Sequence, residues 1–448
     1  SSHFVSSNLP RRTLGVAFVT RVLYSPLARQ MARILALAAC AGHVVQTRGL
    51  KTSSNSSILS LACAGLSLET FEDFVREYGK AYSPEEYGRR RELFESRASL
   101  IARHNCADEH PWMAQVNHMA DWTEPELQVL RGYRRAASPS SAGSAPLANL
   151  RATEGVELPE TVSYGHLESI KRSRDQGQCG SCWAFAATTV LDAHAELNNR
   201  SHQFSVAQII ACTPNPNLCG GSGGCDGATA ELAYEYALQA EVVGEAEFPS
   251  LPGGAQARCP EDKKPWGELA RTGVATAAVH MQDGTEKHLI QWSSEGQRMG
   301  GGRTGLLGWS RFPENKEMQL VQGLVNYGPV AVAVAAGSDW SWYSHGVLTP
   351  AGCDKRNIIS HAVVLYGYGR TTSVKVGEVR YWQIKNSWGR NWGEDGSMRL
   401  QRVGDEEERC GWDSSPEMGS GCKGGPKQVW VCGSCGILYD TVMPLFRL

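Results

Sequence analysis

The segment from Asp175 to Phe185, DQGQCGSCWAF, constrains the fold more than any other part of the chain. Apolar residues recur after it at helical spacing, at Ala186, Val190, Ala193 and Leu197. The pattern predicts a helix that begins near Cys182, with Gly180 and Ser181 as capping residues. The positive end of a helix stabilises a thiolate and so lowers the pKa of the thiol. The sequence therefore predicts a nucleophilic cysteine at a helix N-terminus.

A nucleophilic thiol needs a base, and one of the twelve histidines is well placed in the sequence. His361 opens a strand-like run, HAVVLYGYG, and an amide residue follows it in KNSWGRNWG at Asn386. We expect His361 to pair with Cys182, while the Asn386 carboxamide holds the far ring nitrogen and fixes the tautomer.

Two other interpretations of these residues are open. Cys179 and Cys182 form a Cys-x-x-Cys pair, as do Cys432 and Cys435, which suggests a zinc site or a redox pair. The two pairs lie far apart in the sequence, whereas zinc ribbons separate them by about 15–20 residues, and a redox motif would need a βαβ context. A buried histidine and a turn asparagine are the ordinary interpretation of His361 and Asn386 taken alone. Their combination with the cysteine segment favours catalysis.

The N-terminal part of the chain, residues 1–67, has the pattern of a leader. From Met31 to Gly42 one arginine, an apolar stretch and small residues follow one another, as in a secretory signal peptide. A short amphipathic or buried helix is the alternative, and the apolar run from Ile58 to Leu66 is a second candidate for the signal core. Neither run is long enough to cross a bilayer. We expect the secretory route, ending in a lysosome-like acidic compartment or outside the cell, without stable membrane insertion.

Composition divides the rest of the chain into three parts. Residues 68–135 form a charged helical unit, with 13 acidic and 10 basic residues from Glu69 to Arg135. Residues 136–157 begin with AASPSSAGSAPLA and read as a flexible linker. Residues 158–448 are richer in Gly, Trp and Cys, and a helical half precedes a half with strand patterns at Pro329–Ala336, His361–Tyr366, Arg380–Lys385 and Ser397–Gln401. The Gly-rich run from Arg298 to Gly308 follows no predicted strand and reads as a surface insertion.

Charge and cysteine content limit the class of protein. With 44 Lys and Arg against 46 Asp and Glu, the formal net charge of −2 offers no basic field for nucleic acid. Fourteen cysteines allow several disulfides in an oxidising compartment. Asn55 and Asn199 lie in glycosylation sequons, a weak signal in itself.

These motifs together resemble the papain family of cysteine proteases, which includes the cathepsins, in the form of a zymogen with an inhibitory propeptide. The resemblance implies an α+β, two-lobed fold, with a helical lobe and an antiparallel β-barrel-like lobe behind a small helical prodomain. Residues of the charged unit match the family's propeptide motifs: Glu86, Arg90, Phe94, Ile101, Asn105, Asn117 and Asp121. The resemblance also implies that Gln176 completes an oxyanion hole and that Trp388 shields the His361–Asn386 pair.

The substrate-binding residues are likewise implied by the resemblance. Gly227 and Ala228 stand on the strand that pairs with substrate backbone, where Ala228 replaces the usual glycine. Ala333 and Ile359 match the walls of the pocket for the second side chain upstream of the scissile bond, and Asp440 matches its base. The alternative for Asp440 is that the insertion at about 402–431 displaces it into solvent.

Three disulfides are also implied by the resemblance: Cys179–Cys225, Cys212–Cys259 and Cys353–Cys435. Cys219, Cys410, Cys422 and Cys432 remain, and the sequence does not choose among their three possible pairings.

The sequence thus predicts a cysteine endopeptidase made as a secretory-route zymogen, acting through a Cys182 thioester with His361 as acid and base. The alternative is a catalytically silent protein of the same fold that binds or inhibits. We expect no cofactor and no metal, protein and peptide substrates, the chain's own propeptide as intramolecular inhibitor, and a monomer.

Overall fold

The computed structural model describes residues 70–107, 111–131, 158–200, 202–265, 276–290, 305–373, 377–403, 409–419 and 421–446. The predicted signal peptide at 31–42, the apolar run at 58–66, the sequon at Asn55 and the linker at 136–157 lie outside these residues. None of the described helices is long and apolar enough to cross a membrane.

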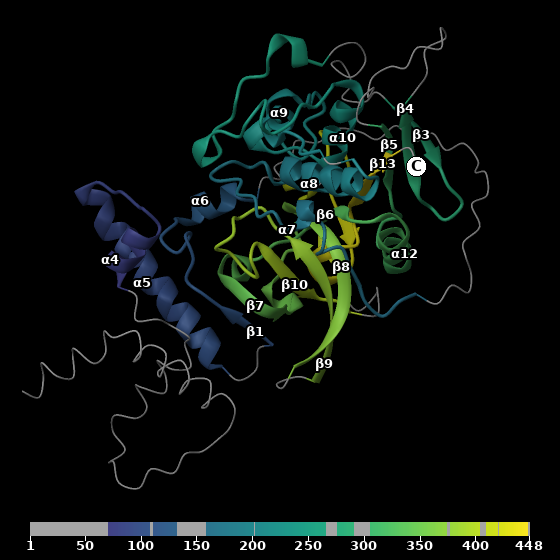
Figure 1. The fold of residues 1–448 in the computed structure, drawn as a ribbon. Coiled ribbons are helices and arrows are strands. Elements are labelled where there is room, and N and C mark those ends of the chain that lie inside the picture. The colour runs from purple at the N-terminus through teal and green to yellow at the C-terminus, as the bar shows by residue number, and fades with distance from the viewer. Residues whose placement is uncertain are drawn as a thin grey trace, which may run out of the picture.

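The charged N-terminal unit is helical and has its own small core. It contains α4 (Phe71–Glu77), α5 (Pro84–Cys106), the short strand β1 (Trp112–Ala114) and α6 (Glu124–Val129). The Phe71, Phe74 and Phe94 rings pack together between α4 and α5. Thr70, Ser83 and Thr123 cap the three helices with side-chain oxygens, which explains where each helix begins. In Figure 1 α4 and α5 project to one side of the molecule.

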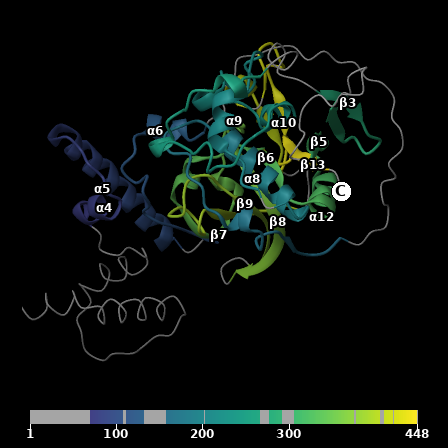
Figure 2. The same cartoon turned by 45° about the horizontal axis from the view of Figure 1, so that its top comes forward.

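The helical lobe is built around one buried helix, α8 (Cys182–Leu197), whose residues from Cys182 to Ala195 are all buried. Because α8 is apolar on every side, it must be covered on every side. The helices α7 (Glu168–Lys171), α9 (Val206–Cys212) and α10 (Ala230–Gln239) contact it, and β8 contacts it from the other lobe. Figures 1 and 2 show α8 between α9 and α10 and the strands. The helix thus contacts the sheet lobe along its length, from Cys182 beside Ala362 to His194 beside Pro329.

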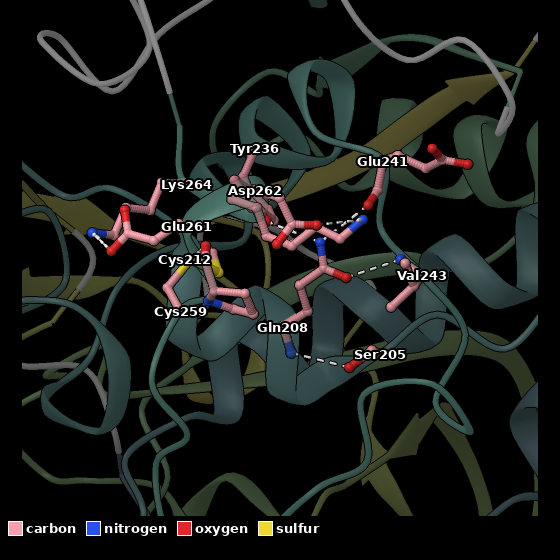
Figure 3. The surroundings of a disulfide bond; sticks show 12 residues. Ser205, Gln208, Cys212, Tyr236, Glu241, Val243, Cys259, Glu261, Asp262 and Lys264 are labelled. Carbon is pink, nitrogen blue, oxygen red and sulfur yellow. Dashed lines mark hydrogen bonds and ion pairs between the residues drawn. A yellow bond between two sulfur atoms is a disulfide. The ribbon is translucent and has the colours of Figure 1, made fainter.

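A disulfide between Cys212 and Cys259 fastens the end of α9 to the loop that follows α10, as Figure 3 shows. Beside it, the Gln208 carboxamide donates to the Tyr236 hydroxyl and the Glu241 carbonyl and accepts from the Val243 amide. Every polar atom of this buried amide therefore has a partner, so α9 and α10 keep a fixed spacing beside α8.

The second lobe is one large, mostly antiparallel sheet. In the described residues its strand order is β1-β7-β10-β9-β8-β6-β13-β5-β4-β3, with β2 (Val162–Ser163) beside β8, and only β10 and β7 pair in parallel. Its strands are β3 (Thr276–His280), β4 (Glu286–Ile290), β5 (Leu306–Arg311), β6 (Val330–Val334), β7 (Tyr343–Leu348), β8 (His361–Ser373), β9 (Gly377–Lys385), β10 (Ser397–Gln401) and β13 (Thr441–Phe446). The helix α12 (Glu317–Tyr327) precedes β6. The predicted helical half followed by a sheet half is confirmed.

Two expectations from the sequence were wrong. The Gly-rich run was expected to be a surface insertion that follows no strand. Residues 298–304 lie outside the described residues, but β4 precedes the run in the chain and residues 306–308 lie in β5, where the Leu306 side chain is fully buried. β5 pairs with β13, so this part of the insertion extends the sheet. Ser181 precedes α8 at the N-cap position but its side chain makes no capping hydrogen bond.

The charged unit docks on the sheet as an additional edge strand. β1 pairs with β7 in antiparallel register, with Trp112 opposite Gly346. The Asn105 carboxamide donates to and accepts from the Ala114 backbone, both at 2.8 Å, and so holds β1 against α5. Asn117 donates to the Ser341 carbonyl at 2.8 Å. The unit is therefore attached through backbone pairing and buried amides.

Candidate active site

The Cys182 thiol lies at the first residue of α8, where the helix dipole favours negative charge. The thiol is fully buried, and the Ala362 N–H points at its sulfur at 3.5 Å. Because Ala362 follows His361 on β8, this contact places the sulfur at the beginning of the strand that carries the imidazole. Both the helix and the amide donor stabilise a thiolate.

His361 and Asn386 meet at the interface of the lobes. His361 Nε2 lies 2.8 Å from Asn386 Oδ1, and the same oxygen accepts the Ser387 N–H at 2.8 Å. Since Oδ1 accepts from Ser387, it is the carbonyl oxygen, and Nε2 carries the proton. Nδ1 is then the ring nitrogen that can exchange a proton with a thiol. The Trp388 ring lies over the imidazole, with centroids 4.9 Å apart.

The Gln176 side chain is held in a fixed orientation by Ser387 and the Cys179 carbonyl. Its Oε1 accepts from the Ser387 hydroxyl at 2.6 Å, and its backbone N–H donates to the Ser387 carbonyl at 2.9 Å. Nε2 therefore faces the opposite way, and it donates to the Cys179 carbonyl at 2.8 Å. A fixed N–H donor of this kind can stabilise a developing oxyanion.

A backbone carbonyl of the N-terminal unit accepts a hydrogen bond from this donor. Gln176 Nε2 also donates to the Leu130 carbonyl at 3.0 Å, and Leu130 is 2% exposed. Burial lowers the pKa of His361 to about 4. The Asn386 hydrogen bond opposes this shift, the Arg131 guanidinium reinforces it, and the Leu130 backbone opposes it. The imidazole is thus neutral at pH 7 in this form of the protein. A substrate carbonyl cannot reach the Gln176 amide while Leu130 holds it.

The residues expected to bind substrate gather between the lobes. Ala228, Ala333 and Ile359 are buried in one apolar cluster that includes Cys182 and Ala362. Gly227, with φ 95°, precedes Ala228 in the left-handed region that favours glycine.

Asp440 is buried rather than exposed, so the solvent-facing alternative is wrong. Its backbone carbonyl accepts the Ala333 N–H at 2.9 Å, which places it beside the expected pocket wall. Burial and the neighbouring Glu231 carboxylate raise the pKa of Asp440 well above its usual value, while Arg311 opposes this rise. Arg311 is ion-paired with Glu231. Glu231 and Asp440 therefore share the Arg311 guanidinium, which Glu286 and Glu314 also face.

Five disulfides are present in the described residues. Three join the pairs implied by the resemblance, Cys179–Cys225, Cys212–Cys259 and Cys353–Cys435. The two pairs that the sequence left open are Cys219–Cys422 and Cys410–Cys432. Within the part of the chain that the structure describes, no group of three or more His, Cys, Asp or Glu side chains is arranged to hold a metal ion.

Sequence reasoning missed two contributors to this site. Ser387 orients Gln176, and its place between Asn386 and Trp388 in the sequence was the available signal. Leu130 has no local signal, because an ordinary leucine supplies only its carbonyl and its partner lies 46 residues away.

Comparison with known proteins agrees with the geometry. The family model described as papain family cysteine protease matches residues 158–420, and that of the cathepsin propeptide inhibitor domain (I29) matches residues 71–127. The chain is 29% identical to a cathepsin L-like proteinase of Fasciola hepatica over 77% of this chain and 92% of that protein. It is 27% identical to a cathepsin L-like protein of Caenorhabditis elegans, over 77% and 89%.

Solved precursors share the fold. Digestive procathepsin L 3 of Tenebrio molitor larval midgut matches with a TM-score of 0.58 and 23% identity, over 85% of this chain and all of that one. Stem bromelain precursor matches with the same score and identity, over 84% and 98%. With its two matched domains and a propeptide carbonyl bound to the Gln176 amide, the chain belongs to the papain family of cysteine proteases and carries an inhibitory propeptide.

Proposed function

We propose that this protein is a zymogen whose mature form hydrolyses peptide bonds through a thioester on Cys182. The observation that carries the proposal is the His361–Asn386 pair at 2.8 Å beside a thiol at the N-terminus of α8. The Gln176 amide, oriented by Ser387, adds the donor that acyl transfer requires.

The reaction proceeds in two balanced steps. The Cys182 thiolate attacks the peptide carbonyl carbon, and the C–N bond breaks as the His361 imidazolium gives its proton to the leaving amine. A thioester and a free amine result. Water then attacks the thioester while neutral His361 takes a proton from it, and the thiolate leaves the carboxylic acid product. Gln176 stabilises the negative oxygen in both steps.

The propeptide supports the zymogen part of the proposal. Its Leu130 carbonyl holds the Gln176 donor, and Arg131 next to it lowers the pKa of His361. Removal of the propeptide frees both groups. Cleavage within the linker at 136–157 would release it, and the secretory route with an acidic destination is the setting that the disulfides and the propeptide favour.

Asp440 is proposed as a specificity-determining residue at the base of the pocket for the second upstream side chain. Glu231 and Asp440 face a single guanidinium, that of Arg311, so one further cation can be accommodated there. An Arg or Lys side chain of the substrate would supply it, while Ala333 and Ile359 leave apolar walls that also suit Leu.

The test is a peptide-cleavage assay on acid-treated protein beside its Cys182→Ala variant, with a thiol alkylator and a chelator as additions. We expect cleavage that Cys182→Ala and the alkylator abolish and that the chelator leaves unchanged. A correctly matured protein that alkylates at Cys182 yet cleaves no peptide would instead support the silent, binding alternative.

A further inference from the structure

The insertion between β10 and β13 forms a small structure of its own. β11 (Gly411–Asp413) pairs with β12 (Val429–Val431), with Trp412 opposite Trp430. The Cys410–Cys432 disulfide joins the outer ends of this pair. The chain that connects β11 to β12 contains Gly419, Gly421, Cys422 and Lys423, which we call the crossing segment.

One end of the crossing segment is fixed to the sheet lobe at Ile359. The buried Asp413 carboxylate accepts the Ile359 N–H at 3.1 Å. Gly419 lies so close to the Ile359 carbonyl oxygen that a Cβ at this glycine would be 1.5 Å from it. Both backbone polar groups of Ile359 thus face the insertion, and no side chain larger than that of glycine fits at position 419.

The other end is fixed to the helical lobe. The Cys219–Cys422 disulfide links the crossing segment to the helical lobe covalently, across 203 residues of sequence. On either side of it, the Gly220 N–H donates to the Gly421 carbonyl at 2.9 Å and the Lys423 N–H donates to the Asn217 carbonyl at 3.0 Å. A covalent bond and two backbone hydrogen bonds hold this end of the crossing segment, so it cannot rotate about a single contact.

Gly220 in turn covers Ala228. A Cβ at Gly220 would lie 2.6 Å from the Ala228 carbonyl oxygen, and the Ala228 side chain is fully buried. Gly220 has φ 67°, a conformation that favours glycine, so the close approach depends on this residue type. By the resemblance, Ala228 pairs with substrate backbone and Ile359 lines the pocket for the second upstream side chain. The crossing segment therefore links Gly220, which packs on Ala228, to Ile359.

We propose that the crossing segment is a fixed barrier that ends the substrate path after the second residue upstream of the scissile bond. An extended peptide advances about 3.3–3.6 Å per residue, so a third residue would need the space taken by Gly220 and Gly421. The mature enzyme then removes one or two residues from the amino terminus of a peptide. This inference rests on the proposed function and replaces the endopeptidase predicted from the sequence with an enzyme that trims amino termini.

The test compares substrate lengths on the acid-matured enzyme. Three fluorogenic substrates share the same dipeptide before the scissile bond and differ at its amino end. In the first this end is a free amine, in the second it is acetylated, and in the third it is extended by two further residues. We expect kcat/KM for the extended substrate to be at least tenfold lower than for the free dipeptide. Cleavage of the extended substrate within threefold of the free dipeptide would overturn the barrier while leaving the proposed chemistry intact.

A pair of disulfide variants tests the tether directly. Cys219→Ser with Cys422→Ser releases the segment from the helical lobe, and we expect the extended-to-dipeptide ratio to rise at least tenfold. Cys410→Ser with Cys432→Ser is the matched control, since that disulfide stays within the sheet-lobe side of the insertion, and its ratio should match that of the unmodified enzyme. An unchanged ratio in the first variant contradicts the proposal. Absence of cleavage of all three substrates by unmodified enzyme would instead refute the proposed function itself.

Discussion

Ser387 shows how a residue that does not itself react with substrate can determine the geometry of the site. Its hydroxyl donates to Gln176 Oε1 and its N–H donates to Asn386 Oδ1, so one residue orients two amides. Without such a partner, the amide can rotate so that its oxygen faces the oxyanion of the substrate. The two oxygens would then repel each other. Ser387 is therefore a positioning residue.

Gln176→Ala should lower kcat by about 10²–10³-fold with little change in KM, because a donor to the developing oxyanion acts in the transition state. Ser387→Ala should lower kcat in the same way but by about tenfold, since the amide remains and only its orientation is lost. Ser387→Thr, which keeps the hydroxyl, should restore most of the rate. A Ser387→Ala enzyme with a raised KM and unchanged kcat would contradict this role.

Asp440 gives a prediction about specificity with a pH dependence. Because its pKa is raised, Asp440 is neutral at low pH and becomes a carboxylate only as the pH rises above that value. Preference for Arg over Leu as the second upstream residue should therefore increase with pH. Asp440→Asn, similar in size but uncharged, should remove this increase and lower the Arg-to-Leu ratio of kcat/KM about tenfold. An unchanged ratio would show that Asp440 does not contact the substrate.

Among the elements, β1 carries much of the propeptide's attachment. Its three residues pair with β7, and Asn105 of α5 satisfies the Ala114 backbone on the other side. Removal of a buried partner leaves a polar group unsatisfied at a cost of about 1–3 kcal/mol.

Asn105→Ala should therefore loosen docking and raise the rate at which iodoacetamide labels Cys182 in the intact precursor at pH 7, by about tenfold. Arg103→Ala is the matched control, because Arg103 is exposed on the same helix, and it should leave the rate unchanged. Equal rates in the two variants would show that β1 docks independently of Asn105.

At the scale of the whole molecule, docking of the propeptide is linked to protonation of His361. Burial lowers the pKa of His361 to about 4 in the docked state; of the propeptide groups, Arg131 adds to this shift and the Leu130 backbone opposes it. The part of the shift that docking causes disfavours the docked state as the pH falls toward 4, by up to about 1.4 kcal/mol per pH unit. Acid thus favours release of the propeptide.

The stabilisation that the Arg90–Glu126 ion pair provides is lost over a different pH range. The Arg90 hydrogen bonds lower the pKa of Glu126 to about 2, so its stabilisation is present above about 4.5 and disappears only as the pH falls through 2. It joins two residues of the propeptide and remains largely in place at pH 4.

We expect the Cys182 alkylation rate of the precursor, divided by that of the mature enzyme, to rise between pH 6.5 and 4. Glu126→Gln should raise this ratio at every pH but keep its slope between pH 6.5 and 4, because His361 is unchanged. A ratio that stays flat to pH 4 and rises only near pH 2 would assign acid release to carboxylates such as Glu126 instead.

The sequence determined the fold class and predicted residues that the structure brings close together, Cys182 beside Ala362 and His361 beside Asn386. Their motifs are short, and each sits where one element begins: Cys182 at the first residue of α8 and His361 at the first residue of β8. Local propensity places such residues at element ends, and the resemblance supplied how the elements come together.

Only the tertiary structure decided the contacts that the insertions make. The pairing of Cys219 with Cys422, the approach of Gly419 to Ile359 and the Leu130 carbonyl on Gln176 all join distant segments. Each depends on how separate surfaces pack, and no periodicity or motif along the chain encodes that packing. The residues proposed for the chemistry therefore lie in short motifs, whereas the proposed limit on peptide length depends on contacts that form only when the chain has folded.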